Sequence, residues 1–448
     1  MASMQPEVPA VDPSNASAVE ETWTTQSPRW KLGTKIAFRF AFVYFSLYNL
    51  YVPLHLLAFP PFSQINALYD SASNTIVHWV SRQVLHLSHD FAKDYLNTSA
   101  GSKDTTFDYV QVLCFLVVAV VATVVWSLVD RRRRNYQWLY KWFIVYMRLS
   151  LAAAMIPYGA IKIFPYQFPP PTLSKMLGTY GNSSPSELMW TFMGASHSYS
   201  VFGGALELLA GMLLVVPRLA TLGALVCAAA MSNVLMLNLG YDFFVKLVSI
   251  HLLLMAIVIF LPDALRLFDF FVLNRTVRLA PARPLAQRVW LNRTFVALQI
   301  AFGLLLVVHD LRSARNIVAL RDAGKNTPLY GVWSVDDFSV DAQPRPPLVN
   351  DPLRWQRFVV ESSEGVAIQE MNGSLLYLHL HPNSLRSAFT LTRYDDPSWI
   401  AEFTYDDSSP GSLSLTGKID GRLIAIKLHR EDEAKFLLKP GFRWIQDP

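Results

Sequence analysis

The chain has 448 residues, of which 52% are hydrophobic and only 16% are charged, and its mean hydropathy is +0.26. An ordinary soluble domain carries about 25% charged residues, so this composition argues against a soluble protein and predicts one that lies mostly in a lipid bilayer. The net charge of +5 is divided among separate segments, which argues against a nucleic-acid partner because such proteins gather their basic residues on one face.

Residues 1–30 are rich in Pro, Ser, Thr and Glu and have no apolar core. A signal peptide needs an apolar region of about 7 to 15 residues, so we interpret this segment as a disordered cytoplasmic tail. The chain has two cysteines, Cys114 and Cys227, and both fall in long apolar segments. We therefore expect no disulfide partners.

A transmembrane helical domain is predicted over 31–312. A spanning helix needs roughly 20 predominantly apolar residues, and seven segments meet this requirement: 31–59, 107–130, 141–164, 199–216, 219–239, 243–261 and 289–310. Lys and Arg gather in alternate connecting segments, and basic residues are retained on the cytoplasmic side. The sequence thus predicts a protein of the cell (inner) membrane, with a cytoplasmic N-terminus and a periplasmic or extracellular C-terminal region.

Two of the predicted outer loops contain amphipathic segments. Residues 65–87 either rest on the membrane surface or pack as an ordinary loop. The loop 165–197 is predicted to hold two short helices, 173–180 and 187–193. These helices either form a lid over the membrane domain or pack as a plain connection.

The composition changes after a linker at 313–329, and the region 330–448 is predicted to be an antiparallel β domain. Runs of alternating polarity predict strands at 355–361, 366–371, 375–381, 388–394, 399–405, 412–418 and 422–429. Two turns, Asn372-Gly373 and Asp420-Gly421, are typical of two-residue hairpins in which both central residues have positive φ. Consecutive hairpins favour a meander that closes into a small barrel or a sandwich.

This β domain resembles lipocalin-like barrels in two places, the Gly331-Val332-Trp333 start and Arg443 near its end. A tryptophan at the start of any first strand explains the former equally well. His379 and His381 share one strand face, with His429 as a conceivable third metal ligand. We predict solvent-facing histidines and no metal, because no carboxylate or cysteine is spaced to complete the set.

Ionisable residues lie within or beside the third, fourth and sixth predicted spans: Arg148, Lys162, Glu207 and Lys246. Each costs at least about 2.5 to 3.5 kcal/mol at bilayer depth, so such residues usually face a partner or a cavity. A seven-residue spacing places Arg148, Met155 and Lys162 on one helix stripe. Gly203 and Gly211 flank Glu207 at four-residue spacing, which predicts a close helix contact there.

We therefore predict a polar pocket between these three spans that opens outward or into the outer leaflet. Its candidate residues are Arg148, Tyr158, Lys162, Glu207, Asn233, Asn238, Asp242, Lys246 and His251. The alternative is structural: the lysines extend to the outer interface, and Glu207 pairs with one of them to join two helices.

At these residues the sequence resembles the DoxX family of small four-helix membrane proteins, which is allied to groups containing thiosulfate:quinone oxidoreductase subunits and vitamin K-dependent carboxylase-type membrane domains. The resemblance covers roughly 147–275. It rests on Arg148, the run from Tyr158 to Phe164 with Lys162, the run from Gly203 to Gly211 with Glu207, Asn233 with Asn238, and the segment from Tyr241 to Lys246. The two preceding spans, one following span and the β domain depart from the family pattern.

The first hypothesis is a redox-linked membrane component that holds a quinone or another amphipathic molecule, with Lys162 and Lys246 as hydrogen-bond donors and Glu207 as proton acceptor. No other cofactor is evident in the sequence, so electrons would come from a periplasmic or other redox partner. Two alternatives stay open. One is a non-catalytic carrier or lipid-handling protein, and the other is a membrane scaffold that presents the exported β domain.

Overall fold

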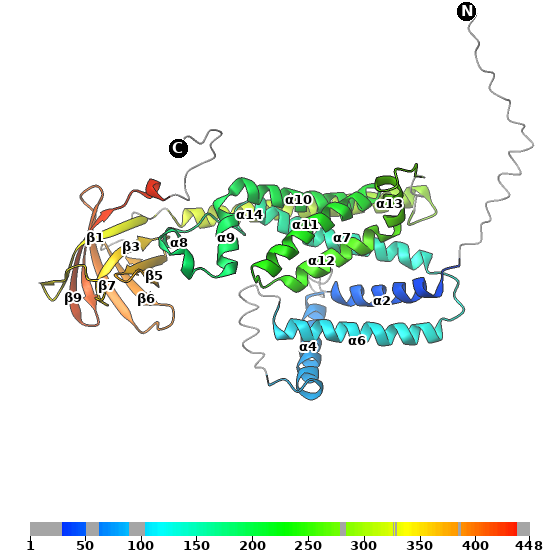
Figure 1. Ribbon diagram of the computed structural model, residues 1–448, viewed down its shortest axis with the longest axis horizontal. Coiled ribbons are helices and arrows are strands. Elements are labelled where there is room, and N and C mark those ends of the chain that lie inside the picture. Colours follow the sequence, from blue (N-terminus) through cyan, green and yellow to red (C-terminus); the bar gives the residue numbers. More distant parts are fainter. Residues whose placement is uncertain are drawn as a thin grey trace, which may run out of the picture. The chain divides into compact units, whose positions relative to one another are not determined.

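The computed structural model describes residues 29–50, 62–88, 104–277, 284–325, 327, 329–383 and 387–436. The chain divides into two compact units, 1–150 with 275–295, and 151–274 with 296–448. It consists of a helical membrane part and a C-terminal antiparallel β-barrel (Figure 1). Almost all of the predicted N-terminal tail, and Arg443, lie outside the described residues.

Six helical segments in the described ranges are long and apolar enough to cross a membrane, which makes this a multi-pass membrane protein. They are Thr106–Val129 (α6), Gln137–Ile163 (α7), His197–Val215 (α10), Pro217–Gly240 with α11 at Ala220–Gly240, Lys246–Phe271 with α12 at Lys246–Phe260 and α13 at Ala264–Phe271, and Val289–Ala323 (α14). The first predicted span corresponds to α2 (Leu32–Tyr48), whose 17 residues extend about 26 Å at 1.5 Å per residue. Residues 51–61 of that span lie outside the described residues.

In the first unit, α6 packs against α2 and also against α4 (Phe62–Trp79). The side-chain amide of Gln111 in α6 donates to the Ser73 hydroxyl in α4 at 2.6 Å. The predicted amphipathic segment 65–87 thus consists of α4 and the turn Val80–Val84 that follows it.

In the second unit, α10 packs against α11, and α11 against α12. Helix α14 has 35 residues, about 52 Å, which exceeds the roughly 30 Å thickness of a hydrocarbon core. Much of the predicted linker is therefore the last part of this helix, which leads into the first barrel strand.

Eight strands form the barrel: β1 (Gly331–Val340), β3 (Trp355–Val360), β4 (Gly365–Glu370), β5 (Leu375–Asn383), β6 (Ala388–Arg393), β7 (Ile400–Asp406), β8 (Ser412–Ile419) and β9 (Arg422–Arg430). Each pairs antiparallel with the next, and β1 pairs with β9 to close the sheet. A two-residue strand, β2 (Gln343–Pro344), extends one edge of β1. The predicted meander is confirmed, and it closes as a barrel rather than a sandwich.

The barrel interior is filled by apolar side chains, as is usual for eight strands. The rings of Trp355, Phe358 and Phe389 follow one another there with centroids 5.8 Å apart. Trp333 is also buried, and its indole N–H donates to the carbonyl of Leu329 at 2.8 Å. The interior thus serves as a hydrophobic core.

The two predicted hairpin turns differ. Asp420 and Gly421 have φ of 49° and 79°, which confirms a turn with two positive φ values. The prediction is wrong for Asn372, because only Gly373 has positive φ there. The Asn372 side chain instead accepts from the backbone N–H of Ser374 at 2.7 Å, which stabilises a longer connection between β4 and β5.

The loop after α7 packs against the outside of the barrel through α8 (Leu173–Leu177) (Figure 1). Leu173 is buried with Val332 and Val359, whose side chains point outward from β1 and β3. The backbone N–H of Ser174 donates to the Glu361 carboxylate at 2.8 Å. This outer loop and the barrel therefore share a small hydrophobic core.

Candidate functional site

Lys162 and Glu207 form a buried ion pair between two membrane helices. Lys162 lies in the last turn of α7 and Glu207 in the middle of α10, and they are 7% and 2% exposed. The Lys162 ammonium donates to Oε1 of Glu207. Of the alternatives left open by the sequence, Glu207 therefore pairs with the lysine of α7.

Glycines allow the two helices to approach closely at this pair. A Cβ at Gly159 would lie 2.6 Å from the backbone nitrogen of Leu208, and one at Gly204 would lie 2.7 Å from the carbonyl oxygen of Gly159. The predicted close helix contact at Glu207 is thus confirmed, but Gly203 was the wrong glycine. A Cβ at Gly203 would meet no described atom within 4 Å, so the contact face runs through Gly204 and Gly211.

The second carboxylate oxygen of Glu207, Oε2, is buried and has no hydrogen-bond partner among the described residues. A buried polar atom without a partner costs about 1 to 3 kcal/mol, and more when it is charged. Such an atom in a folded protein needs a specific explanation, such as an ordered water, a bound molecule or a chemical role. Tyr158, the candidate residue of α7, lies four residues before Lys162 in the same helix and is partly buried.

Lys246 forms a separate ion pair with Asp242 at the turn between α11 and α12. Its ammonium lies 2.8 Å from the Asp242 carboxylate, whose side chain is 86% exposed. The hydrogen bond and the charge of Lys246 lower the pKa of Asp242. Asp242 also has a φ of 49° and helps to turn the chain. The carboxylate of this pair is thus exposed, although the Lys246 side chain is only 22% exposed, whereas both members of the Lys162–Glu207 pair are buried.

Asn238 and His251 form hydrogen bonds with other groups of the α11 and α12 region. The side-chain amide of Asn238 donates to the Ser249 hydroxyl at 3.2 Å, which joins the end of α11 to the start of α12. Nδ1 of His251 lies 2.6 Å from the carbonyl oxygen of Leu247, one helical turn earlier. Asn233, in contrast, is on an exposed part of α11.

The predicted stripe on α7 is buried along its length, since Arg148, Met155 and Lys162 are all nearly inaccessible. This confirms that the stripe faces protein. Arg148 belongs to the first unit, whereas Lys162 and Glu207 belong to the second.

The two halves of the outer loop pack on different partners. Helix α9 (Pro185–Ala195) contributes Met189 and Met193 to a cluster with Phe168 and Phe243. It thus lies over the α11–α12 turn, whereas α8 packs on the barrel. The two short helices predicted from sequence are present, and no single lid unites them.

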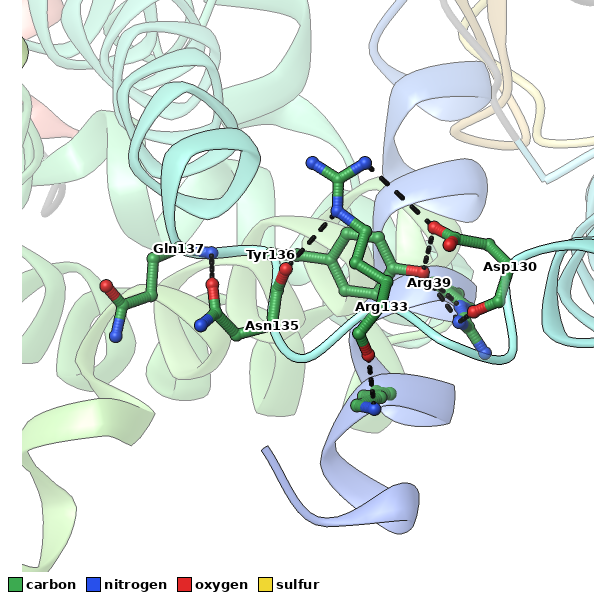
Figure 2. A network of polar contacts seen from close by, with 7 residues as sticks. Arg39, Asp130, Arg133, Asn135, Tyr136 and Gln137 are labelled. Atoms are coloured by element: carbon green, nitrogen blue, oxygen red, sulfur yellow. Dashed lines mark hydrogen bonds and ion pairs between the residues drawn. The ribbon is translucent and has the colours of Figure 1, made fainter. Parts of the chain in front are cut away.

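Sequence reasoning missed a polar network centred on Arg39 in α2 (Figure 2). The Arg39 guanidinium donates to the Tyr136 hydroxyl at 2.6 and 3.0 Å and to the Ser127 hydroxyl at 2.7 Å. Tyr136 in turn donates to the Asp130 carboxylate at 2.8 Å. A usable signal existed, because Arg39 is a charged residue inside an apolar segment and Asp130 ends the next one.

In the described part of the chain, no three His, Cys, Asp or Glu residues are grouped so as to hold a metal ion. The histidines of the barrel have other neighbours. His429 lies 2.8 Å from the Asp336 carboxylate, His381 lies 3.1 Å from the Thr392 hydroxyl, and the His379 ring lies against that of Tyr394.

No protein-family model matches the chain, and no solved structure matches it. Among curated proteins, the uncharacterized protein YwoB of Bacillus subtilis (strain 168) is 29% identical over 133 residues. The match covers 28% of this chain and 79% of that protein. The similarity is to a protein whose name states no activity.

Proposed function

We propose that this membrane protein binds a quinone or another amphipathic small molecule beside Lys162 and Glu207, and that it acts as a redox-linked membrane component. The supporting observation is the buried Oε2 of Glu207, which has no hydrogen-bond partner in the described part of the chain, while Oε1 is paired with Lys162. A hydroxyl or protonated group of a bound molecule would supply the missing hydrogen bond and thereby remove its cost.

The chemistry of the pair suits a molecule that gains and loses protons. Quinone reduction couples electrons to protons, and a carboxylate near the bound ring can accept or return a proton. A lysine ammonium has three N–H donors, and Glu207 takes one of them, so the same group can also donate to a carbonyl oxygen of the ligand. Electrons are supplied by a partner protein in this proposal.

The proposal includes the resemblance to the DoxX family and a topology. The segment 147–275 would form the family-like part, with the N-terminus in the cytoplasm and the barrel in the periplasm or outside the cell. The asymmetry of basic residues supports this orientation. In this arrangement the loop that carries α8 and α9 lies on the same side as the barrel, consistent with the contact between α8 and β3.

The test is to identify what co-purifies with the full-length protein in nanodiscs of native lipid. Solvent extraction and mass spectrometry of the wild-type protein should show a quinone or a related amphipathic molecule in amounts comparable to the protein. Glu207→Gln and Lys162→Met should each lose it. The double variant Asp242→Asn, Lys246→Met removes the exposed ion pair and is the matched control, so it should keep the molecule. Absence of any such molecule from folded wild-type protein would refute the proposal.

A second candidate is a scaffold that presents the barrel to partner proteins, with a carrier that handles lipid as a related possibility. The observation that favours a scaffold is the filled barrel interior, which leaves the outer surface as the place for binding. Deleting 330–448 should then abolish the cellular phenotype, and the Lys162 and Glu207 variants should leave it intact. A carrier predicts a bound lipid in the same mass-spectrometric experiment.

A further inference from the structure

The short loop between α6 and α7 is held to α2 by its backbone. The Lys35 ammonium donates to the carbonyl of Arg133 at 2.6 Å, and the backbone N–H of Trp30 donates to the carbonyl of Arg134 at 3.0 Å. Arg39 donates to the carbonyl of Asp130 at 2.9 Å. Three carbonyls of this loop thus accept hydrogen bonds from α2 and from Trp30 just before it, and these bonds hold the loop backbone in one conformation.

The arginine side chains of this loop are exposed. Arg131, Arg132 and Arg134 are all solvent-accessible, and the side chain of Arg133 is half exposed. The Arg133 guanidinium lies 5.1 Å from the centre of the Tyr136 ring and 4.0 Å from the Asp130 carboxylate (Figure 2). The loop thus presents guanidinium groups from a rigid base, unlike a flexible basic segment.

The positive charge around the loop greatly exceeds the negative charge. Within the described residues of this loop and of the facing part of α2, six are basic, Lys35, Arg39 and Arg131 to Arg134, and one is acidic, Asp130. Two of these cations, Lys35 and Arg39, are buried beneath the loop. Such an excess of fixed positive charge attracts anions, and planar guanidinium groups bind phosphate oxygens through paired hydrogen bonds.

The position of the loop in the chain indicates which kind of anion it would meet. Helix α6 ends at Val129 and α7 begins at Gln137, so the loop lies at the ends of two membrane-spanning helices. Trp138 is exposed at the start of α7, and Trp126 is in the last turn of α6. Tryptophans are enriched at the headgroup level of membranes.

From these observations we propose that the 131–134 loop, held by Lys35, Arg39 and Tyr136, is a binding site for the phosphate headgroup of an anionic phospholipid. The argument is independent of the proposed quinone site and of the orientation of the protein, because either leaflet can supply the headgroup. Each basic residue near a membrane surface contributes roughly a fivefold gain in affinity for anionic lipid.

The test uses the full-length protein in detergent, titrated with phosphatidylglycerol or phosphatidylcholine and analysed by native mass spectrometry. Wild-type protein should retain phosphatidylglycerol selectively. The triple variant Arg131→Gln, Arg132→Gln, Arg134→Gln should weaken that binding on the order of a hundredfold. The matched control carries three exposed basic residues of the barrel changed in the same way, Lys418→Gln, Arg422→Gln and Lys427→Gln, and should bind like wild type.

Equal affinity of the wild-type protein for the two lipids would overturn the proposal, and so would equal losses in the two triple variants. Full displacement of the lipid by about 10 mM inorganic phosphate would also overturn it, because the site would then select a free anion. If the loop variant fails to insert into the membrane, a salt titration of the wild-type protein still tests the proposal. Affinity for phosphatidylglycerol that does not fall as screening increases would contradict an electrostatic headgroup site.

Discussion

The contact between α7 and α10 can be tested with neighbouring glycines that have opposite environments. A methyl group at Gly204 would lie 2.7 Å from both the carbonyl oxygen of Gly159 and Cβ of Lys162, closer than such atoms approach in proteins. The helices must therefore separate by roughly 1 Å. Overpacking of this kind costs about 1 to 3 kcal/mol, whereas Gly→Ala in a helix otherwise gains up to about 1 kcal/mol. We expect Gly204→Ala to destabilise the protein by about 0 to 2 kcal/mol.

Gly203→Ala is the matched control, because its new methyl group meets no atom of the described residues within 4 Å. It should be neutral or stabilising by up to about 1 kcal/mol. Thermal unfolding in nanodiscs can be followed with a thiol-reactive dye, because Cys227 in α11 is fully buried and reacts only on unfolding. The measurements use a Cys114→Ser background, which removes the other thiol. If Gly204→Ala is as stable as Gly203→Ala, then the two helices do not touch as described here and the geometry of the ion pair is wrong.

Three further predictions concern the ion pair and the outer loop. Lys162→Met should lower the free energy of unfolding by about 3 to 5 kcal/mol, because it leaves Glu207 buried without its partner, and the added change Glu207→Gln should restore much of that loss. Denaturant titration of the single and double variants measures these free energies. Additive effects of the two changes would contradict a direct pair. Leu173→Ala should cost about 2 to 5 kcal/mol of the contact between α8 and the barrel, seen as faster proteolysis of the loop, whereas Tyr180→Ala, which changes a side chain that is 80% exposed, should not. The backbone N–H of Ser184 lowers the pKa of Glu187 below its ordinary value of 4.5. This cap therefore stabilises α9 above about pH 4.5, and the stabilisation is lost as the pH falls through the lowered pKa. The melting temperature of Glu187→Gln should accordingly lack the part of the fall at acid pH that this cap causes in the wild type.

Local patterns predicted the spans and strands well because each depends on a short periodicity. The strand expected at 412–418 occurs as Ser412–Ile419, and the span expected at 107–130 occurs as Thr106–Val129. Features that depend on few residues were missed. The two-residue strand Gln343–Pro344 is too short to show alternation, and the Asn372 turn depends on side-chain bonds that a dipeptide does not encode.

The candidate site was only partly predictable for a different reason. Spacing placed Glu207 at a helix contact, but adjacent glycines differ by only about 100° around a helix, so the sequence did not decide between Gly203 and Gly204. Nor did it decide which lysine pairs with Glu207. Asp242 lies four residues before Lys246 and pairs with it. The choice required the three-dimensional arrangement.

The two buried cations that the structure describes in most detail suggest different roles. Every nitrogen of the Arg39 guanidinium donates a hydrogen bond, and the Tyr136 hydroxyl that receives two of these bonds passes one on to Asp130. Such a fully satisfied network rigidifies the structure around it. In the Lys162–Glu207 pair, by contrast, one buried carboxylate oxygen has no hydrogen-bond partner among the residues that the structure describes. That oxygen can still accept a hydrogen bond from a polar group of a ligand or from water. This difference is why the proposed ligand site is at Glu207, while Arg39 has a supporting role.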